Sequence, residues 1–335
     1  MSDSQGAQVG HVSQADSQGA SRGIPGANPR AATLGAVAAI GCYLCWGLFP
    51  AFFPLLEPAG AAEIVAHRIV WSAVLMAVVL LALRQFGRVR ALPASSWLKL
   101  TIASTLVSAN WSLYVYTVNS GRVTEAALGY FINPLVSVIF GVLFFRERLL
   151  RAQLVAVGIA VAAVVVLTFG YGHFPFLSIG LALSFGGYGV AKKTVKEPPT
   201  VSLGAEVFIS APFALAFLVW LHAMGSASLG HGTFGHAGAG NAVLLILSGV
   251  VTVLPLLLFA TAAQRIPLAL LGMLQYITPA LQMLWALLVV GERLDGTQWC
   301  GFALVLAAVV LFSGSQFLAE AKRARASREG ARRAA

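Results

Sequence analysis

The sequence predicts an all-α membrane protein with ten transmembrane helices, arranged as two inverted repeats of five helices each. Three observations predict this fold class: the composition is very apolar, the apolar residues fall into ten runs, and one segment occurs twice. Hydrophobic residues make up 58% of the 335 residues and charged residues 10%, whereas an average soluble domain has about 25% charged residues. A soluble chain of this composition would have too little polar surface to cover its core.

Each of the ten apolar runs has roughly the 20 residues that a helix needs to cross the hydrocarbon layer of a bilayer. This length favours helices over a barrel, whose strands would be alternating segments of about ten residues. Charged or Gly/Pro-rich breaks separate the runs. The predicted spans are residues 33–56, 62–83, 97–119, 124–145, 152–169, 175–191, 200–222, 241–263, 268–290 and 297–318.

The spans divide the chain into two predicted five-helix repeats, residues 33–170 and 175–318, between two tails. Residues 1–32 are rich in Gln, Ser, Gly and Ala, which predicts a disordered tail, and they lack the pattern of a secretory signal peptide. Residues 319–335 contain the basic run KRARASREGARRAA. This run favours contact with anionic lipid headgroups over nucleic acid.

The orientation follows from Lys and Arg, which are enriched in cytoplasmic loops. With the N-terminus inside, Arg122 and Arg293 fall in outer loops and Arg68 lies near the outer end of the second span. The longest outer loop, residues 225–240, has no Lys or Arg. Both termini are therefore predicted to be cytoplasmic. Besides the basic tail, the residues on that side are Arg84, Arg88, Arg90, Lys99, Arg146, Arg148, Arg151, Lys192, Lys193, Lys196 and Arg265.

One segment occurs in two copies, residues 131–153 and 276–298, which align with a shift of 145 and match at seven of 23 positions. The copies lie in spans four and nine, so five spans separate them and they cross the membrane in opposite directions. Inverted repeats are typical of secondary transporters, whose substrate sites lie near the midplane where the repeats meet. A duplication kept only for stability is the alternative.

Five short motifs carry a resemblance to a known family. They are AHRIVWS (66–72), NWSLYVYTVN (110–119), EAALGYFINPL (125–135), FRERL (145–149) and QYITP (275–279). Together they resemble RarD-type permeases of the EamA family, within the drug/metabolite transporter superfamily, and the resemblance covers residues 33–318. It implies ten helices in two inverted repeats, cytoplasmic termini in the bacterial inner membrane, and export of a small metabolite or drug-like molecule.

Ionisable residues inside a membrane span are costly and are therefore functional candidates. Glu63 and His67 are four residues apart near the start of the second span, so they share a helix face, and Arg68 follows. One interpretation is an interfacial cluster whose side chains reach water. The other is a gating or coupling site, in which Arg68 contacts an anionic substrate and His67 titrates near neutral pH.

Polar and aromatic residues in spans three, four and nine predict a substrate cavity. Pro134 and Pro279 occupy the same place in the two copies, and each proline leaves a kink with a free backbone acceptor that must face a partner or a cavity. Packing between helices, by kinks and interhelical hydrogen bonds, is the alternative. The predicted substrate-binding residues are Asn110, Trp111, Tyr114, Tyr130, Asn133, Gln275, Tyr276 and Thr278.

The remaining acidic residues have simpler interpretations. Glu206 in span seven either carries protons or pairs with a cytoplasmic Lys, and Glu147 and Glu292 after the repeated spans are explained by caps or loop salt bridges. No Cys/His cluster suggests a metal site, and the sequence predicts no cofactor.

The leading functional hypothesis is a secondary transporter that works by alternating access on a small-molecule substrate within the lipid bilayer, with a proton as a candidate coupling ion. The sequence contains no ATP-binding motif, so the energy would come from a gradient. The alternatives are an intramembrane enzyme that uses Glu63 and His67, or a passive channel.

Overall fold

The structure is a computed structural model that describes most of the membrane part of the chain. The described residues are 29–119, 123–169, 176–224, 231–291 and parts of 296–319. Every regular element in these residues is helical. The predicted tails, 1–32 and 319–335, lie almost wholly outside the described residues, as do Arg122, Glu292 and Arg293.

The first half of the chain folds into long helices joined by short connections. Proline fits the first turn of a helix because its missing N–H would be unpaired there in any case, and prolines begin the short helices α2 and η1 that end the first predicted span. The elements are α1 (Pro29–Gly47), α2 (Phe49–Phe52), η1 (Phe53–Leu56), α3 (Ala61–Ala82), α4 (Phe86–Arg90), α5 (Ala94–Asn119), α6 (Val123–Phe145) and α7 (Arg151–Phe169).

The second half is also built of helices, and its predicted ninth span is interrupted. The segment predicted as span nine consists of two short helices and a single π-helical stretch, η2, rather than one continuous helix. The elements are α8 (Phe176–Thr194), α9 (Pro199–Ala223), α10 (Ala239–Ala263), α11 (Leu268–Leu274), α12 (Ile277–Trp285) and η2 (Ala286–Val290). The described part of each of the ten predicted spans is largely helical, with turns at Leu48, at Leu83 and at residues 275–276.

Six helical segments in the described residues are long and apolar enough to cross a membrane. Large apolar side chains on them point outward: Phe213 is 77% exposed and Leu288 is 80% exposed. Such side chains are unfavourable in water and fit a hydrocarbon environment. The six segments are Arg30–Leu56, Ala61–Ala82, Leu128–Phe145, Pro199–Ala223, Ala239–Ala263 and Leu268–Val289, and shorter apolar helices are Arg151–Val166 and Trp299–Ser315.

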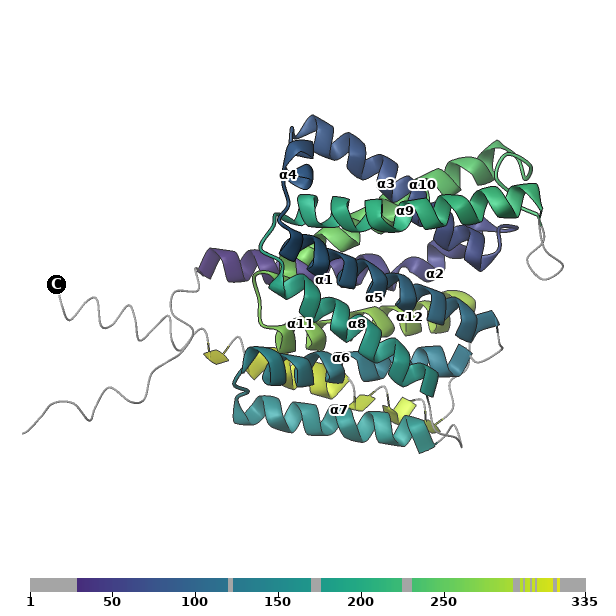
Figure 1. Cartoon of the computed structure of the whole chain (residues 1–335). Helices are drawn as coiled ribbons and strands as arrows, with labels where there is room; N and C mark the ends of the chain where they lie inside the picture. The colour runs from purple at the N-terminus through teal and green to yellow at the C-terminus, as the bar shows by residue number, and fades with distance from the viewer. Residues whose placement is uncertain are drawn as a thin grey trace, which may run out of the picture.

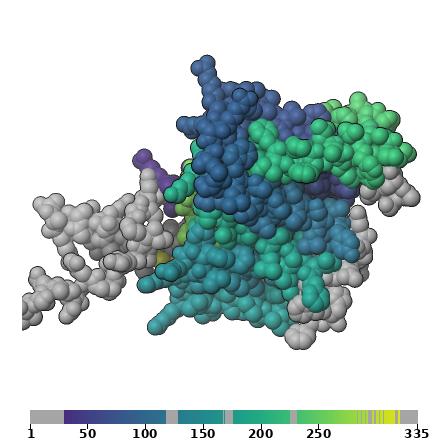
Figure 2. All heavy atoms as spheres, viewed as in Figure 1, coloured from purple at the N-terminus to yellow at the C-terminus, as the bar shows by residue number. Residues whose placement is uncertain are grey.

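The helices run side by side as a bundle (Figure 1). Helix α3 contacts α9 and α10, whereas α6 contacts α8 and α11, and α5 lies between these groups with contacts to α8 and α9. The start of α1 and helix α4 lie at one end of the bundle, and α2 lies toward the other (Figure 1). On the face shown in Figure 2, residues of α3 to α5 (blue) cover the upper middle, residues of α9 and α10 (green) the upper right, and residues of α6 to α8 (teal) the lower part.

Helices α6 and α11 approach each other closely because small residues lie between them. A Cβ at Gly272 would come 2.5 Å from Ser137 Cβ and 2.9 Å from the Pro134 carbonyl oxygen. Beyond the end of α6, the Glu147 carboxylate accepts hydrogen bonds from the backbone N–H groups of Leu268 (2.7 Å) and Ala269 (2.9 Å). Both interpretations of Glu147 are confirmed, because it caps a helix of the other half of the chain and also lies 3.5 Å from Lys193 Nζ.

Candidate functional site

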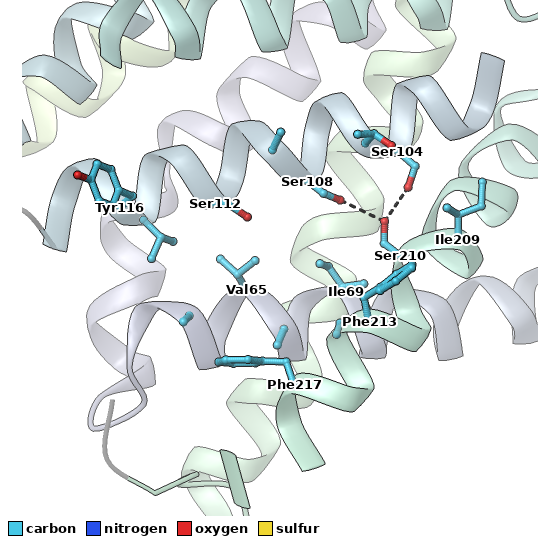
Figure 3. Close-up of a pocket in the computed structure, with 16 residues that line it drawn as sticks. Val65, Ile69, Ser104, Ser108, Ser112, Tyr116, Ile209, Ser210, Phe213 and Phe217 are labelled. Carbon is cyan, nitrogen blue, oxygen red and sulfur yellow. Dashed lines mark hydrogen bonds between the residues drawn. The ribbon is translucent and has the colours of Figure 1, made fainter. Parts of the chain in front are cut away.

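A groove of about 630 Å³ lies between α3, α5 and α9. One wall is the apolar face of α3, with Val65 and Ile69, and another is the face of α9 that carries Phe213 and Phe217 (Figure 3). The exposed side chain of Phe213 shows that the groove opens at the surface of the bundle. Its volume falls within the range of roughly 300–1,000 Å³ that is usual for small-molecule sites.

The polar wall of the groove is a stripe of serines on α5. Ser104, Ser108 and Ser112 are spaced four residues apart and therefore lie on one helix face. The hydroxyl of Ser210, on α9, meets the Ser104 hydroxyl at 2.6 Å and the Ser108 hydroxyl at 3.1 Å (Figure 3). Ser112 also lines the groove, so the stripe supplies hydroxyl groups along an otherwise apolar space.

A second, smaller cavity of about 20 Å³ continues the groove inward. It shares Ile69, Ser104, Ser108 and Ser210 with the groove. Its other lining residues include Trp111, Glu206 and Thr252, which come from α5, α9 and α10. The serine stripe therefore forms the boundary between the outer groove and the buried polar residues of the bundle.

Arg68 is buried beside this inner cavity. Its Nε donates a hydrogen bond to the Thr252 hydroxyl at 2.9 Å. The guanidinium carbon lies over the rings of Trp111 (4.8 Å), Phe53 (5.4 Å) and Phe49 (5.5 Å). These distances allow cation–π attraction, which stabilises a cation without neutralising it.

Three of the predicted substrate-binding residues gather around Arg68. Trp111 stacks against the guanidinium, and Tyr114 and Tyr130 lie close enough to interact with its charge. The two tyrosine rings, from α5 and α6, are 5.9 Å apart. The structure thus brings together residues that the sequence places in three separate spans.

Asn110 lies on a different side of α5. Its Nδ2 donates to the Leu181 carbonyl oxygen (2.8 Å) and to the Ser184 hydroxyl (2.9 Å), both on α8. These bonds tie α5 to α8, as the packing interpretation of this amide predicts. Asn110 therefore does not line the cavities with Trp111, although the two residues are adjacent in sequence.

The two proline-containing segments differ in local structure. Helix α6 runs without a break through Pro134. In the second copy the helix is divided between α11 and α12 just before Pro279, and the Gln275 carbonyl oxygen, which Pro279 cannot pair with, accepts the Thr278 N–H at 3.0 Å. Asn133 and Gln275 are both buried beside these prolines.

Hydrogen bonds from the second copy reach backbone groups of other helices. The Tyr276 hydroxyl donates to the Phe131 carbonyl oxygen of α6 at 2.9 Å, and the Thr278 hydroxyl donates to the Tyr43 carbonyl oxygen of α1 at 3.0 Å. The Asn133 Oδ1 atom, in contrast, has no hydrogen-bond partner among the described residues. Tyr276 and Thr278 thus connect helices, whereas Asn133 retains an unused acceptor.

Glu63 and His67 lie together on α3, with His67 Nε2 3.8 Å from Glu63 Oε1. The same Glu63 oxygen accepts hydrogen bonds from the Thr233 N–H (2.6 Å), the Thr233 hydroxyl (3.1 Å) and the Phe234 N–H (3.3 Å). The His67 ring packs on the Phe234 ring, with centroids 4.9 Å apart. Both residues therefore hold the connection between α9 and α10 against α3.

Glu206 forms a buried ion pair. Lys192 Nζ lies 2.7 Å from Glu206 Oε1 and also donates to the Ser202 hydroxyl at 2.8 Å. The Tyr188 hydroxyl donates to the second Glu206 oxygen at 3.3 Å. Of the two interpretations of Glu206, the geometry matches pairing with a Lys, which is nevertheless buried inside the bundle rather than in a loop.

Two features of the site, the serine stripe and the buried Lys192, are not among the residues predicted from the sequence. The serine stripe could have been predicted, because hydroxyl side chains at positions 104, 108 and 112 repeat every four residues in an apolar helix. The burial of Lys192 could not have been predicted, because two adjacent lysines at the end of α8 resemble an ordinary cytoplasmic helix end. Within the described residues no group of three or more His, Cys, Asp or Glu could hold a metal ion.

The EamA-like transporter family matches this chain twice, over residues 33–169 and 175–314. Protein RarD from Streptomyces exfoliatus is 46% identical over 293 residues, which cover 87% of this chain and 91% of that protein. The uncharacterized transporter YojE from Bacillus subtilis is 44% identical over 279 residues, covering 82% and 91%. Chloramphenicol-sensitive protein RarD from Pseudomonas aeruginosa is 30% identical over 271 residues, covering 78% and 87%.

A solved crystal structure shows the same fold. It superposes with a TM-score of 0.63 at 18% sequence identity and covers 84% of this chain and 96% of the other. The family matches, the identity to named transporters and the apolar helices agree with each other. The chain therefore belongs to the EamA-like transporter family, as the resemblance of its motifs to RarD-type permeases predicts, and is a multi-pass bacterial membrane transporter.

Proposed function

We propose that this transporter is a secondary permease that exports a small amphipathic molecule by alternating access between two inverted five-helix repeats, with both termini cytoplasmic. The two family matches, one in each half, support the repeat. The helix contacts support it as well. When α1, α3, α5 and α6 are matched in order with α8, α9, α10 and α12, a contact between two helices has a counterpart between their two matches. The pairs are α6–α8 with α12–α1, α5–α8 with α10–α1, and α3–α10 with α9–α5.

The observation that carries the proposal is the groove with its inner cavity. The groove lies between α3 and α5 of the first half and α9 of the second, and substrate sites of inverted-repeat transporters lie where the repeats meet. A relative movement of the halves would change the distance between the serine stripe on α5 and Ser210 on α9. The hydroxyl–hydroxyl bonds of Ser210 are the contacts that such a movement breaks and remakes.

The lining of the groove matches an amphipathic solute. Apolar side chains of α3 and α9 would contact its hydrocarbon part, and the hydroxyls of α5 would bond its polar group. Hydroxyl groups both donate and accept hydrogen bonds, so they accommodate different polar groups. This chemistry agrees with a metabolite or drug-like molecule.

The test is counterflow in liposomes that contain the purified full chain. We would supply a panel of radiolabelled amino acids and related small metabolites, together with chloramphenicol, at two values of the pH gradient. A secondary permease shows specific, saturable accumulation of at least one solute. A response to the pH gradient would identify the proton as the coupling ion.

The groove is tested by a matched pair of serine variants. Ser108→Ala removes a hydroxyl from the stripe, and we expect roughly a three- to tenfold lower exchange rate, corresponding to a net hydrogen bond of about 1 kcal/mol. Ser248→Ala is the control, because the described partner of its buried hydroxyl is the Leu245 carbonyl oxygen of its own helix, away from the groove. Equal effects of the two variants, or flux that never saturates as in a channel, would contradict the proposal.

A further inference from the structure

Arg68 occupies an unusual position for a buried cation. Its side chain comes from α3 and is surrounded by Phe49, Phe53 and Trp111, with Tyr114 and Tyr130 nearby. We propose that Arg68 and these aromatic residues form the binding site for a singly charged organic carboxylate, which is the substrate class of the permease. This inference rests on the proposed function and adds to it the charge and shape of the transported molecule.

The first argument is the number of unused hydrogen-bond donors. Arg68 Nε donates a hydrogen bond to the Thr252 hydroxyl. Within the described residues the terminal nitrogens Nη1 and Nη2 donate to no acceptor, and they are not among the fully enclosed polar atoms, so a ligand can reach them. The edge of a guanidinium that carries parallel N–H groups matches a carboxylate, which accepts two hydrogen bonds side by side. Aromatic rings stabilise the charge but supply no comparable acceptor.

The second argument is the absence of a compensating acid. The buried carboxylates of the described residues interact with groups other than Arg68. Glu63 interacts with His67 and the Thr233 backbone, and Glu206 pairs with Lys192. No described carboxylate lies within ion-pair distance of Arg68. A buried charge without a partner is unfavourable, so an arriving anion supplies what the bundle itself lacks.

The third argument concerns the shape and charge of the ligand. Arg68 has no second Lys or Arg among its described contacts, and one cation favours a single negative charge over a phosphate dianion. Three aromatic rings against the guanidinium, with Tyr114 and Tyr130 nearby, favour a flat or apolar body attached to the carboxylate. The cluster therefore fits an aromatic or similarly apolar carboxylate better than an inorganic anion.

The fourth argument is access. Trp111 and Thr252, which both contact Arg68, also line the inner cavity that shares its outer residues with the groove. At about 20 Å³ this cavity has room for little more than a water molecule, so a solute that enters the groove along the serine stripe would reach Arg68 when the helices move apart, as alternating access requires. The hydroxyls of the stripe would bond the carboxylate on the way.

The experiment measures ligand binding to the purified full chain in detergent by thermal unfolding, followed by tryptophan fluorescence. The probes are phenylacetate and its uncharged analogue phenylacetamide, with phenethylamine as the cation. A ligand that binds the folded state raises the unfolding midpoint in a concentration-dependent way. We expect such a shift with phenylacetate and none with the amide or the amine.

Two variants locate the site. We expect Arg68→Gln to weaken phenylacetate binding by about tenfold or more, and Arg68→Lys to retain only part of it because an ammonium lacks the parallel N–H pair. Ser248→Ala is the control that retains the full shift. The same phenylacetate shift in Arg68→Gln, an equal shift with phenylacetamide, or no shift of the folded wild-type chain with phenylacetate would each overturn the proposal.

The outcomes also separate this inference from the permease itself. Counterflow of a neutral or cationic solute that Arg68→Gln leaves unchanged would overturn the carboxylate site while the permease stands. Phenylacetate binding that depends on Arg68, without counterflow of any solute, would support the site and count against the permease.

Discussion

Two buried cations of the bundle, Lys192 and Arg68, have opposite surroundings. Lys192 is completely buried on α8, and the Glu206 carboxylate and the Ser202 hydroxyl bind its ammonium. Arg68 on α3 has one hydroxyl partner, Thr252, and otherwise aromatic rings. The first cation is paired with an acid of the bundle, whereas the second has no acidic partner among the described residues.

On the proposed carboxylate site, the difference separates a charge that stabilises the fold from a charge that binds a ligand. A buried ion pair with satisfied hydrogen bonds holds its helices in one arrangement, and removing one partner leaves an unpaired charge in the interior. Replacing a buried cation that has no acidic partner leaves no buried carboxylate unpaired. Substitutions should therefore affect folding at Lys192 and ligand binding at Arg68, and the predictions below test this contrast in order of their expected effect on stability.

The largest loss of stability is expected for Lys192→Met. The substitution leaves Glu206 buried with only the weaker Tyr188 hydrogen bond, and removal of one member of such a pair costs about 3–5 kcal/mol. Thermal unfolding in detergent measures the loss. The double variant Lys192→Met with Glu206→Met removes both charges and should recover most of it, whereas a fully stable single variant would show that the pair is unimportant.

A smaller loss is expected for Glu63→Ala. Its carboxylate accepts hydrogen bonds from Thr233 and Phe234, which hold the connection between α9 and α10, and a hydrogen bond to a charged group is worth about 1.5–3 kcal/mol. Hydrogen exchange of the Thr233 and Phe234 amides should accelerate. Glu63→Gln keeps an acceptor and should retain part of the protection; if both variants exchange like the wild type, the carboxylate does not hold this connection.

Asn110 and Asn133 provide a comparison between two buried amides. Asn110→Ala removes two hydrogen bonds to α8 and should lower stability by about 1–2 kcal/mol, with protein yield and counterflow falling together. The Asn133 Oδ1 atom has no described partner, so Asn133→Ala leaves no other group without its hydrogen bond. We therefore expect Asn133→Ala to lower counterflow more than protein yield, and we expect the same of Gln275→Leu. Parallel losses of yield and counterflow at Asn133 and Gln275 would assign these residues to folding.

The smallest change in stability is expected for Arg68→Gln. The Thr252 hydroxyl still donates to the Ser248 carbonyl oxygen, and no described acid loses a partner, so the unfolding free energy should change by less than about 1 kcal/mol. Measured beside Lys192→Met in the same detergent, this variant gives the contrast directly. An Arg68→Gln protein as unstable as Lys192→Met would mean that both cations serve the fold.

The sequence by itself determined the class of the protein and the position of its helices. Apolar runs of membrane-spanning length mark the helical segments, and the motifs around Pro134 and Pro279 identify the family. The spacing of Glu63 and His67 also placed them on one helix face. These properties depend on composition, on the period of the α-helix and on local sequence, all of which can be read along the chain.

Only the tertiary structure decided which residues meet. Arg68 meets Thr252 across 184 positions, Ser210 faces the serines of α5, and Glu147 caps a helix of the other half. Asn110 and Trp111 are neighbours in sequence but serve different surfaces. The physical reason is that helical periodicity defines the faces of each helix, whereas the neighbour that each face contacts is set by side-chain packing between helices distant in sequence.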